Sequence, residues 1–204
     1  MKIGICGGTF DPFHRGHLDP ILAVRDEMEW ARIIYIPAWQ QPFKADREHA
    51  SGYHRFAMAV LATIAVDAVS VSPRELERGT ISYTVETLEL MRHEHPTATL
   101  DWIIGDDNIA RLRQWKRLDR ILELANFVIL TRGDAEVTDP ALKGRVTAAG
   151  KRHTHGSIVM ARNRAVPVSS TDIRRRVRTG EGISELVDPQ VSRYIQHYGL
   201  YREV

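Results

Sequence analysis

Residues 7–17 read Gly7-Gly8-Thr9-Phe10-Asp11-Pro12-Phe13-His14-Arg15-Gly16-His17. This stretch follows a β-rich segment, residues 2–6, and precedes a helix-like stretch that begins near Leu18. Glycines let backbone amides approach an anion closely, and a helix start adds unpaired N–H groups and the positive end of a dipole. The stretch is not a Walker loop, because no Gly-Lys-Ser/Thr follows, and it is not the G-x-G-x-x-G dinucleotide fingerprint. It predicts a polyphosphate site of another kind.

Two histidines within this stretch, His14 and His17, are three residues apart. If a helix begins here, they share one face and can aim two ring N–H donors at the same anion. They could also ligate a metal ion. A single histidine more often only packs or caps a helix, but two at helical spacing after a glycine loop favour phosphate binding.

The rest of the chain alternates between β-rich and helix-like segments. We expect strands at residues 2–6, 33–37, 69–72, 100–104, 127–130 and 157–160, and helices at residues 17–30, 53–65, 84–95, 107–125, 171–179 and 189–197. This order predicts an α/β fold with an open parallel sheet, helices on both faces and a C-terminal helical segment. Such sheets bind ligands outside the carboxyl ends of their strands, so the functional loops should follow strands.

Composition describes an ordinary globular protein of 204 residues with 28 Lys and Arg, 26 Asp and Glu, and a formal charge of +2. No linker or repeat divides it, so we expect a single domain over residues 1–204. The one cysteine, Cys6, excludes an internal disulfide and suits a reducing compartment, which favours the cytoplasm. Monomer and homo-oligomer both stay open.

Membrane and nucleic-acid partners are not expected. The longest apolar stretch, residues 57–66, is far too short to span a bilayer, and the N-terminus has no export signal. The positive charge is spread over the chain, and its longest basic run is Arg174-Arg175-Arg176. We therefore expect neither membrane insertion nor general binding to nucleic acid.

A second candidate anion site lies at residues 168–174, Val-Ser-Ser-Thr-Asp-Ile-Arg. Ser169, Ser170 and Thr171 supply hydroxyls where a helix N-cap belongs, and an acidic residue follows Ser169 by three positions. Taken alone, this is a well-capped surface helix with solvated arginines. The planar fork of Arg174 can nevertheless bind two phosphate oxygens at once.

Two segments between these sites carry groups suited to a nucleotide. Asp107 follows an apolar strand and Gly105, and a carboxylate at a strand end can hold ribose hydroxyls, although Asp107 could simply cap a helix. Trp115, ten residues after Gly105, offers a flat ring for stacking or a surface anchor. Tyr83 and Thr84 lie in a segment where Ser82 or Thr84 could simply begin a helix.

These segments together resemble the nucleotidylyltransferase superfamily and, within it, the bacterial nicotinate mononucleotide adenylyltransferases. Residues 7–17 match GGTFDPxHxGH at every fixed position, and residues 168–174 match ISSTxIR with Val168 in place of Ile. Residues 81–88 are similar to PSYTxxTL with Ile81 in place of Pro, and residues 103–115 are similar to IIGxDxxxxxxxW. Residues 186–201 resemble the family ending LVPDxVxxYIxxHGLY.

The resemblance implies a Rossmann-like fold and adenylyl transfer from ATP to nicotinate mononucleotide, giving nicotinate adenine dinucleotide and pyrophosphate in NAD biosynthesis. It implies that Mg²⁺ arrives on the ATP phosphates, with no protein metal ligand. The catalytic residues would be His14, His17 and Arg174. ATP would also contact Gly7, Gly8, Thr9, Phe10, Gly105, Asp107, Ser169, Ser170 and Thr171, and the mononucleotide would contact Lys44, Tyr83, Thr84 and Trp115.

Two positions depart from the family. Phe43 stands where the family often has His beside the lysine that corresponds to Lys44, and Thr131-Arg132-Gly133 lacks the proline of the family's RPG turn. Two other functions stay open. Phosphopantetheine adenylyltransferases share both anion motifs but are shorter chains, and a nucleotide sensor could keep the fold without turnover.

Overall fold

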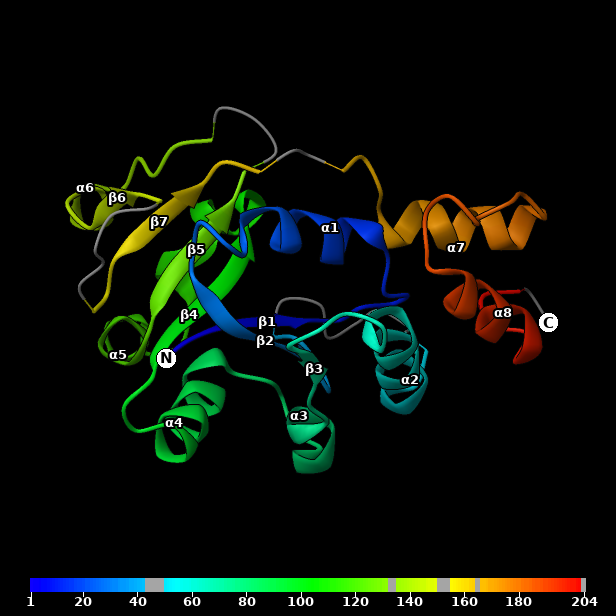
Figure 1. Ribbon diagram of the computed structural model, residues 1–204, viewed down its shortest axis with the longest axis horizontal. Coiled ribbons are helices and arrows are strands. Elements are labelled where there is room, and N and C mark those ends of the chain that lie inside the picture. The colour runs from blue at the N-terminus through cyan, green and yellow to red at the C-terminus, as the bar shows by residue number, and fades with distance from the viewer. Residues whose placement is uncertain (43–49, 132–134, 150–154, 164–165, 203–204) are drawn as a thin grey trace.

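Seven strands form one sheet in the computed structural model, which describes residues 1–42, 50–131, 135–149, 155–163 and 166–202. The strands are β1 (Lys2–Gly8), β2 (Trp30–Pro37), β3 (Val69–Val71), β4 (Thr99–Gly105), β5 (Asn126–Leu130), β6 (Val146–Ala148) and β7 (Ile158–Ala161). They pair in parallel in the order β3-β2-β1-β4-β5-β7-β6 (Figure 1). The predicted open, Rossmann-like parallel sheet is confirmed.

Helices connect the strands and complete the C-terminus. They are α1 (Arg15–Val24), α2 (Gly52–Thr63), α3 (Arg74–Arg78), α4 (Thr84–Glu94), the 3-10 helix η1 (Asp106–Gln114), α5 (Leu118–Leu124), α6 (Pro140–Lys143), α7 (Ser170–Thr179) and α8 (Pro189–His197). Within the described ranges, no helix is both long and apolar enough to cross a membrane.

Two predicted helices are corrected by the structure. The helix expected at residues 107–125 is divided into η1 and α5, because Trp115 is extended and Arg117 adopts a left-handed conformation with φ of 55°. The helix expected at residues 17–30 ends at Val24. Trp30 instead begins β2, where its indole N–H donates to Asp101 Oδ2 at 2.8 Å. Apolar periodicity alone did not distinguish these breaks.

Three short elements were not predicted: α3, α6 and β6. Each has five residues or fewer, which is too short to produce a clear periodic pattern. The strand β6 lies at the sheet edge and alternates exposed and half-buried residues, so it carries no apolar run.

The sheet buries apolar residues on both of its faces. One face packs side chains such as Ile5, Leu100 and Phe127 against Leu88 of α4 and Ile121 of α5. The opposite face forms a second cluster around α1, which includes Ile21, Val24, Ile33, Tyr35 and Val128. Neighbouring residues of one strand, such as Phe127 and Val128, thus serve opposite faces, and helices lie on both sides of the sheet (Figure 1).

A third apolar cluster joins the C-terminal helices to α2. It includes Met58 of α2, Ile173 of α7, and Val187, Val191 and Ile195 in or before α8. Figure 1 shows α7 and α8 together at one end of the molecule, beside α2. This packing confirms the C-terminal helical segment and brings the beginning of α7 to the loop after β1.

The order of the strands determines where a ligand can enter. From β1 the chain proceeds to β2 and β3 on one side of the sheet, and it returns to β4 on the other side of β1. The loops after β1 and β4 therefore diverge at the carboxyl edge, which is the place where open α/β sheets bind ligands.

Candidate functional site

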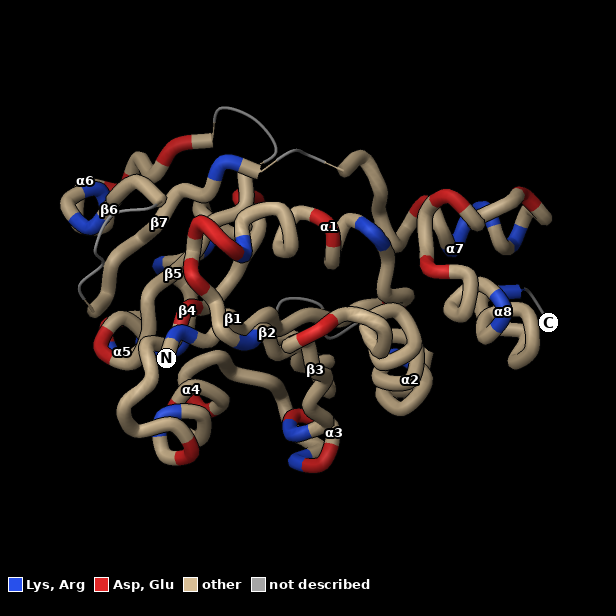
Figure 2. Tube along the Cα trace, in the orientation of Figure 1, with Lys and Arg blue, Asp and Glu red and all other residues tan. Residues whose placement is uncertain are grey.

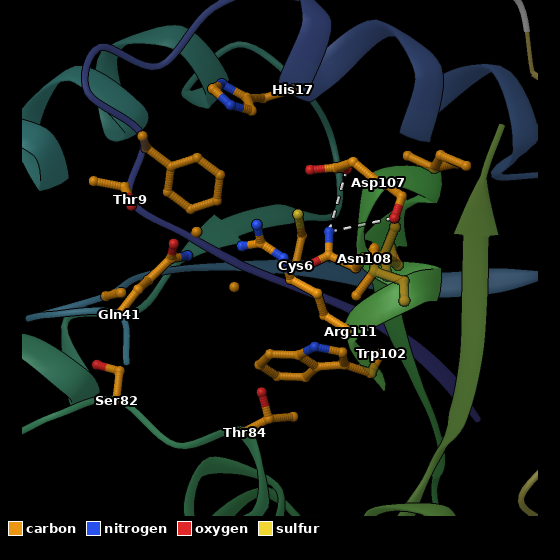
Figure 3. Close-up of a pocket in the computed structure, with 18 of the residues that line it drawn as sticks. Cys6, Thr9, His17, Gln41, Ser82, Thr84, Trp102, Asp107, Asn108 and Arg111 are labelled. Atoms are coloured by element: carbon orange, nitrogen blue, oxygen red, sulfur yellow. Dashed lines mark hydrogen bonds between the residues drawn. The ribbon is translucent and has the colours of Figure 1, made fainter. Parts of the chain in front are cut away.

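A cavity of about 760 Å³ opens at this edge of the sheet and collects residues from segments that are far apart in the sequence. Figure 3 shows His17 at one end of the cavity and Thr84 at the other, with Trp102 between them. Of the sequence-predicted residues, those that line it are Gly7, Gly8, Thr9, Phe10, His17, Tyr83, Thr84, Gly105, Asp107, Trp115, Ser170, Thr171 and Arg174. His14 and Ser169 lie just outside this lining, and Lys44 falls outside the described residues.

The two histidines lie at the start of α1. His14 is the N-cap residue and His17 is in the first turn, and their rings stack with centroids 3.6 Å apart. The backbone N–H of His14 donates to His17 Nδ1 at 3.2 Å. Because Nδ1 accepts this bond, the neutral His17 ring carries its proton on Nε2. His17 reaches the cavity, whereas His14 is 5% exposed and lies against the His17 ring.

The two glycines end strand β1 instead of forming a loop. A Cβ atom at Gly7 would come within 2.7 Å of the Trp102 ring, and one at Gly8 would come within 2.6 Å of the Phe10 ring. The missing side chains therefore make room for two aromatic rings in the cavity wall. Thr9 follows, and its buried Oγ1 has no hydrogen-bond partner among the described residues. A buried hydroxyl in this state indicates a place for a polar ligand.

Arg174 on α7 reaches the loop after β1, as a converging anion site requires. Its Nη1 donates to the backbone oxygen of Asp11 at 2.7 Å and lies 3.7 Å from Asp11 Oδ2. Its Nη2 donates to Thr171 Oγ1 at 3.4 Å. Arg174 also lines the cavity, so the same guanidinium binds the loop after β1 and faces the space where a ligand could bind.

The hydroxyls at the start of α7 are used mainly for local structure. Ser169 Oγ accepts the backbone N–H of Asp172 at 3.2 Å, which confirms the predicted N-cap. Ser170 Oγ donates to the Pro12 oxygen at 3.1 Å and joins the two anion motifs directly. Thr171 lines the cavity.

The three arginines of the basic run on α7 differ in what they contact. Figure 2 shows positive and negative residues together along α7. Arg175 and Arg176 donate to Asp172 at 2.9 Å and 2.8 Å, and Arg175 also pairs with Glu181. Only Arg174 of the three lines the cavity.

Asp11 is a cavity residue to which the sequence reasoning assigned no role. Its side chain is buried, and its Oδ1 accepts the Tyr201 hydroxyl at 2.7 Å and the Ala50 N–H at 3.3 Å. Burial, together with the charge of Asp11, raises the pKa of Tyr201, so Tyr201 remains a donor. The only sequence signal was the position of Asp11 inside the motif, since Tyr201 lies 190 residues away.

Arg55 is a second unassigned residue that supports the same loop. It is 2% exposed and donates to the backbone oxygens of Thr9 at 2.6 Å, Ala50 at 3.0 Å and Trp39 at 3.3 Å. Burial lowers the pKa of Arg55, and the nearby Asp11 opposes that change. A charged residue next to the apolar run of α2 was its one sequence signal.

The loop after β4 presents a carboxylate and an amide to the cavity. A Cβ atom at Gly105 would come within 2.6 Å of Asp107 Oδ1, so the glycine allows this carboxylate to fold back over the strand end. Asn108 Nδ2 donates to Asp107 Oδ1 and to the Gly105 oxygen, both at 3.3 Å (Figure 3). Asp107 is in the first turn of η1 and Gly105 is its N-cap residue. These oxygens are suited to accept hydroxyl groups.

The far end of the cavity combines aromatic rings with the start of α4. Tyr83 is the N-cap residue of α4, and Thr84 is its first residue. Ser82 Oγ accepts the Trp39 N–H at 3.0 Å, which holds this turn to the chain after β2. Trp115 is half-buried, packs edge to face on Phe127 with centroids 5.6 Å apart, and also lines the cavity. The same ring can therefore anchor η1 and face a ligand.

Several further cavity residues were not predicted, among them Cys6, Arg111 and Lys116 (Figure 3 labels the first two). Burial raises the pKa of the Cys6 thiol to about 12, so the thiol is protonated at neutral pH and is not a nucleophile. Arg111 and Lys116 add positive charge to the walls formed by η1 and the residues after it.

Comparison with known proteins places these features in one family. The cytidylyltransferase-like family model matches residues 5–176. A protein of Gemmatimonas aurantiaca is 38% identical over 206 residues, covering all of this chain and 93% of that protein. A protein of Thermoanaerobacter is 36% identical over 208 residues, with 100% and 95% covered. Both relatives are named "Probable nicotinate-nucleotide adenylyltransferase".

The fold is also similar to a solved structure. Plasmodium falciparum nicotinic acid mononucleotide adenylyltransferase, complexed with NaAD, superposes with a TM-score of 0.75 and 19% identity. The match covers 98% of this chain and 97% of that one. At this identity the likeness supports the fold alone.

We predict that Tyr201→Phe lowers the free energy of unfolding by about 1–3 kcal/mol, because the buried Asp11 carboxylate loses a donor. Urea unfolding of the purified variant measures the change. Tyr198→Phe is the control, since it removes a hydroxyl from a ring that is 54% exposed on the same segment. Equal stabilities of Tyr201→Phe and the unsubstituted protein would show that the bond does not support the fold.

Proposed function

The chain belongs to the nicotinate-nucleotide adenylyltransferases, within the cytidylyltransferase-like nucleotidyltransferases, and from this premise we propose how its cavity performs adenylyl transfer. The enzyme transfers the adenylyl group of ATP to nicotinate mononucleotide, giving nicotinate adenine dinucleotide and pyrophosphate in NAD biosynthesis. One observation supports this assignment most strongly: His17 and Arg174, which lie near opposite ends of the sequence, line a single cavity with Trp115.

The phosphates of ATP would bind between α1 and α7. His17 would donate from Nε2, Arg174 would add a positive charge, and the N-terminal amides of the two helices would supply further donors. His14 would act from behind by stacking on His17. The buried Thr9 hydroxyl supports this placement, because a phosphate oxygen would give it a partner. Gly7, Gly8, Phe10, Ser169, Ser170 and Thr171 would shape the same end.

The chemistry requires no side-chain nucleophile. The 5′-phosphate of the mononucleotide is already an anion and would attack the α-phosphorus of ATP, with pyrophosphate leaving in line. Rate would come from positioning the two phosphates and from neutralising the charge that develops on the leaving group. The neutral Cys6 thiol takes no part in this scheme.

Family membership implies a divalent metal ion with the nucleotide, and we propose Mg²⁺. Among the described residues, no group of three or more His, Cys, Asp or Glu could hold a metal ion. Mg²⁺ prefers phosphate oxygens and water as ligands, so the nucleotide itself would carry the ion. When bound, Mg²⁺ would neutralise phosphate charge, while His17 and Arg174 hold the phosphates in position.

The adenylate ribose of ATP and the pyridine ring of the mononucleotide would bind farther along the cavity. Asp107, folded over Gly105, would accept the hydroxyls of the adenylate ribose. The pyridine ring of the mononucleotide would stack on Trp115, with main-chain groups of Tyr83 and Thr84 at its carboxylate. Lys44 stays a proposed contact for the mononucleotide phosphate.

A substrate panel tests the function directly. We predict that the purified enzyme, with ATP and Mg²⁺, releases pyrophosphate fastest with nicotinate mononucleotide, more slowly with its amide, and not with phosphopantetheine. Turnover of phosphopantetheine would instead indicate a phosphopantetheine adenylyltransferase. Binding of ATP and the mononucleotide without any pyrophosphate release would identify a nucleotide sensor.

We predict that His17→Ala lowers kcat by about 10²-fold, because one preorganised donor to the phosphates is lost. Pyrophosphate release under saturating substrates measures the effect, and circular dichroism checks that the fold is retained. His93→Ala is the matched control, since His93 is exposed near the end of α4. Turnover in His17→Ala within twofold of the control would rule out the proposed role.

We predict that Trp115→Leu raises KM for nicotinate mononucleotide by about 10-fold and changes KM for ATP much less, because only the mononucleotide loses a stacking partner. Leucine keeps apolar contact with Phe127. Trp39→Leu is the control, since Trp39 is 42% exposed and does not line the cavity. An equal rise in both KM values would contradict stacking on the pyridine ring.

A further inference from the structure

Lys116 occupies a defined place at the proposed pyridine end of the cavity. It directly follows Trp115, lines the cavity and has a side chain that is 46% exposed. Its Nζ lies over the Tyr83 ring, 4.0 Å from the ring centroid. A cation over an aromatic face is attracted by the ring, so the ammonium is held at the cavity wall. Lys116 thus adjoins Trp115 in the sequence and Tyr83 in space, and both are residues that we assign to the pyridine mononucleotide.

The charges around Lys116 leave its ammonium available to a second anion. Lys116 Nζ lies 2.8 Å from Glu86 Oε1, while Arg78 Nη1 lies 3.3 Å from the other oxygen of Glu86. Two cations therefore share one carboxylate, and an ammonium has three donors. Glu86 lies in the first turn of α4, where the amide dipoles also stabilise its charge.

A second carboxylate, Glu75, lines this part of the cavity but faces inward. It is 3% exposed, and its Oε1 accepts the Thr87 hydroxyl at 2.5 Å. Burial raises the pKa of Glu75, although the Thr87 and Ser82 hydroxyls and the nearby Arg78 and Arg74 oppose that shift. Glu75 is therefore a buried group held by a hydrogen bond to Thr87, whereas Glu86 is the carboxylate that pairs with Lys116.

We propose that Lys116 determines specificity for the pyridine substituent: its ammonium favours a mononucleotide that bears a ring carboxylate over one that bears a carboxamide. The inference rests on the proposed function, because that function stacks the pyridine ring on Trp115 and places its carboxylate at Tyr83 and Thr84. A carboxylate is attracted to the ammonium, whereas a neutral carboxamide gains only a weaker, uncharged hydrogen bond. The position is half-solvated, so the attraction is modest and falls as salt increases.

The test compares kcat/KM for nicotinate mononucleotide and its amide at saturating ATP. Lys116→Met keeps the apolar stem over Tyr83 and removes the charge. We expect the acid-to-amide ratio of kcat/KM to fall about fivefold, mainly through a higher KM for the acid. Lys116→Arg keeps a cation and should retain most of the ratio. Raising the salt concentration should lower the ratio of the unsubstituted enzyme and leave that of Lys116→Met nearly constant.

Arg120→Met is the control for loss of one positive charge. The Arg120 side chain is 40% exposed on α5, pairs with Glu89 and Glu123, and does not line the cavity. The acid-to-amide ratio of kcat/KM should therefore not change in Arg120→Met. An unchanged ratio in Lys116→Met, or equal losses with both mononucleotides, would overturn the inference while leaving the proposed function intact. If the unsubstituted enzyme turned over neither mononucleotide, the proposed function itself would fail.

Discussion

The buried carboxylate of Asp11 is the interaction on which the geometry of the cavity depends. A buried charge is costly unless it is paired and hydrogen-bonded. Asp11 obtains its partners from three separate parts of the fold: the Tyr201 hydroxyl after α8, the Ala50 N–H before α2, and Arg174 on α7. The loop after β1 is therefore held in the native structure by contacts to the C-terminal helices and to the residues before α2. The anion site and the packing of the C-terminus thus share the same contacts.

Local signals in the sequence predicted the elements that carry these residues. The start of α7 was predicted because Ser169 is an N-cap, and α8 was predicted from its helical periodicity at the bounds that the structure shows. The parallel sheet followed from strands that alternate with helices. The resemblance to one family then supplied the site residues, and the structure gathers most of them around one cavity, although their individual roles remain predictions.

Other features depend on contacts that no local pattern reveals. Arg55 looks like an ordinary helix residue until its three backbone acceptors are seen, and these belong to separate segments that all precede it in the sequence. The glycines of residues 7–8 were expected to bring amides to an anion, but their observed neighbours are the rings of Trp102 and Phe10. The break between η1 and α5 depends on the conformation of Arg117, which apolar periodicity does not encode.

The charged residues differ between the two ends of the cavity. That difference can orient two substrates whose own charges are unevenly distributed. Arg174 and His17 lie at the end formed by α1 and α7, where a triphosphate needs several donors. Lys116 lies at the other end, beside aromatic rings, where one carboxylate suffices. Asp107, in the first turn of η1, adds a carboxylate to the lining that offers acceptors and would repel phosphate. Under the proposed function, a ligand with many charges at one end and one charge at the other would be accepted in a single direction, and this would align the reacting phosphates before any bond changes.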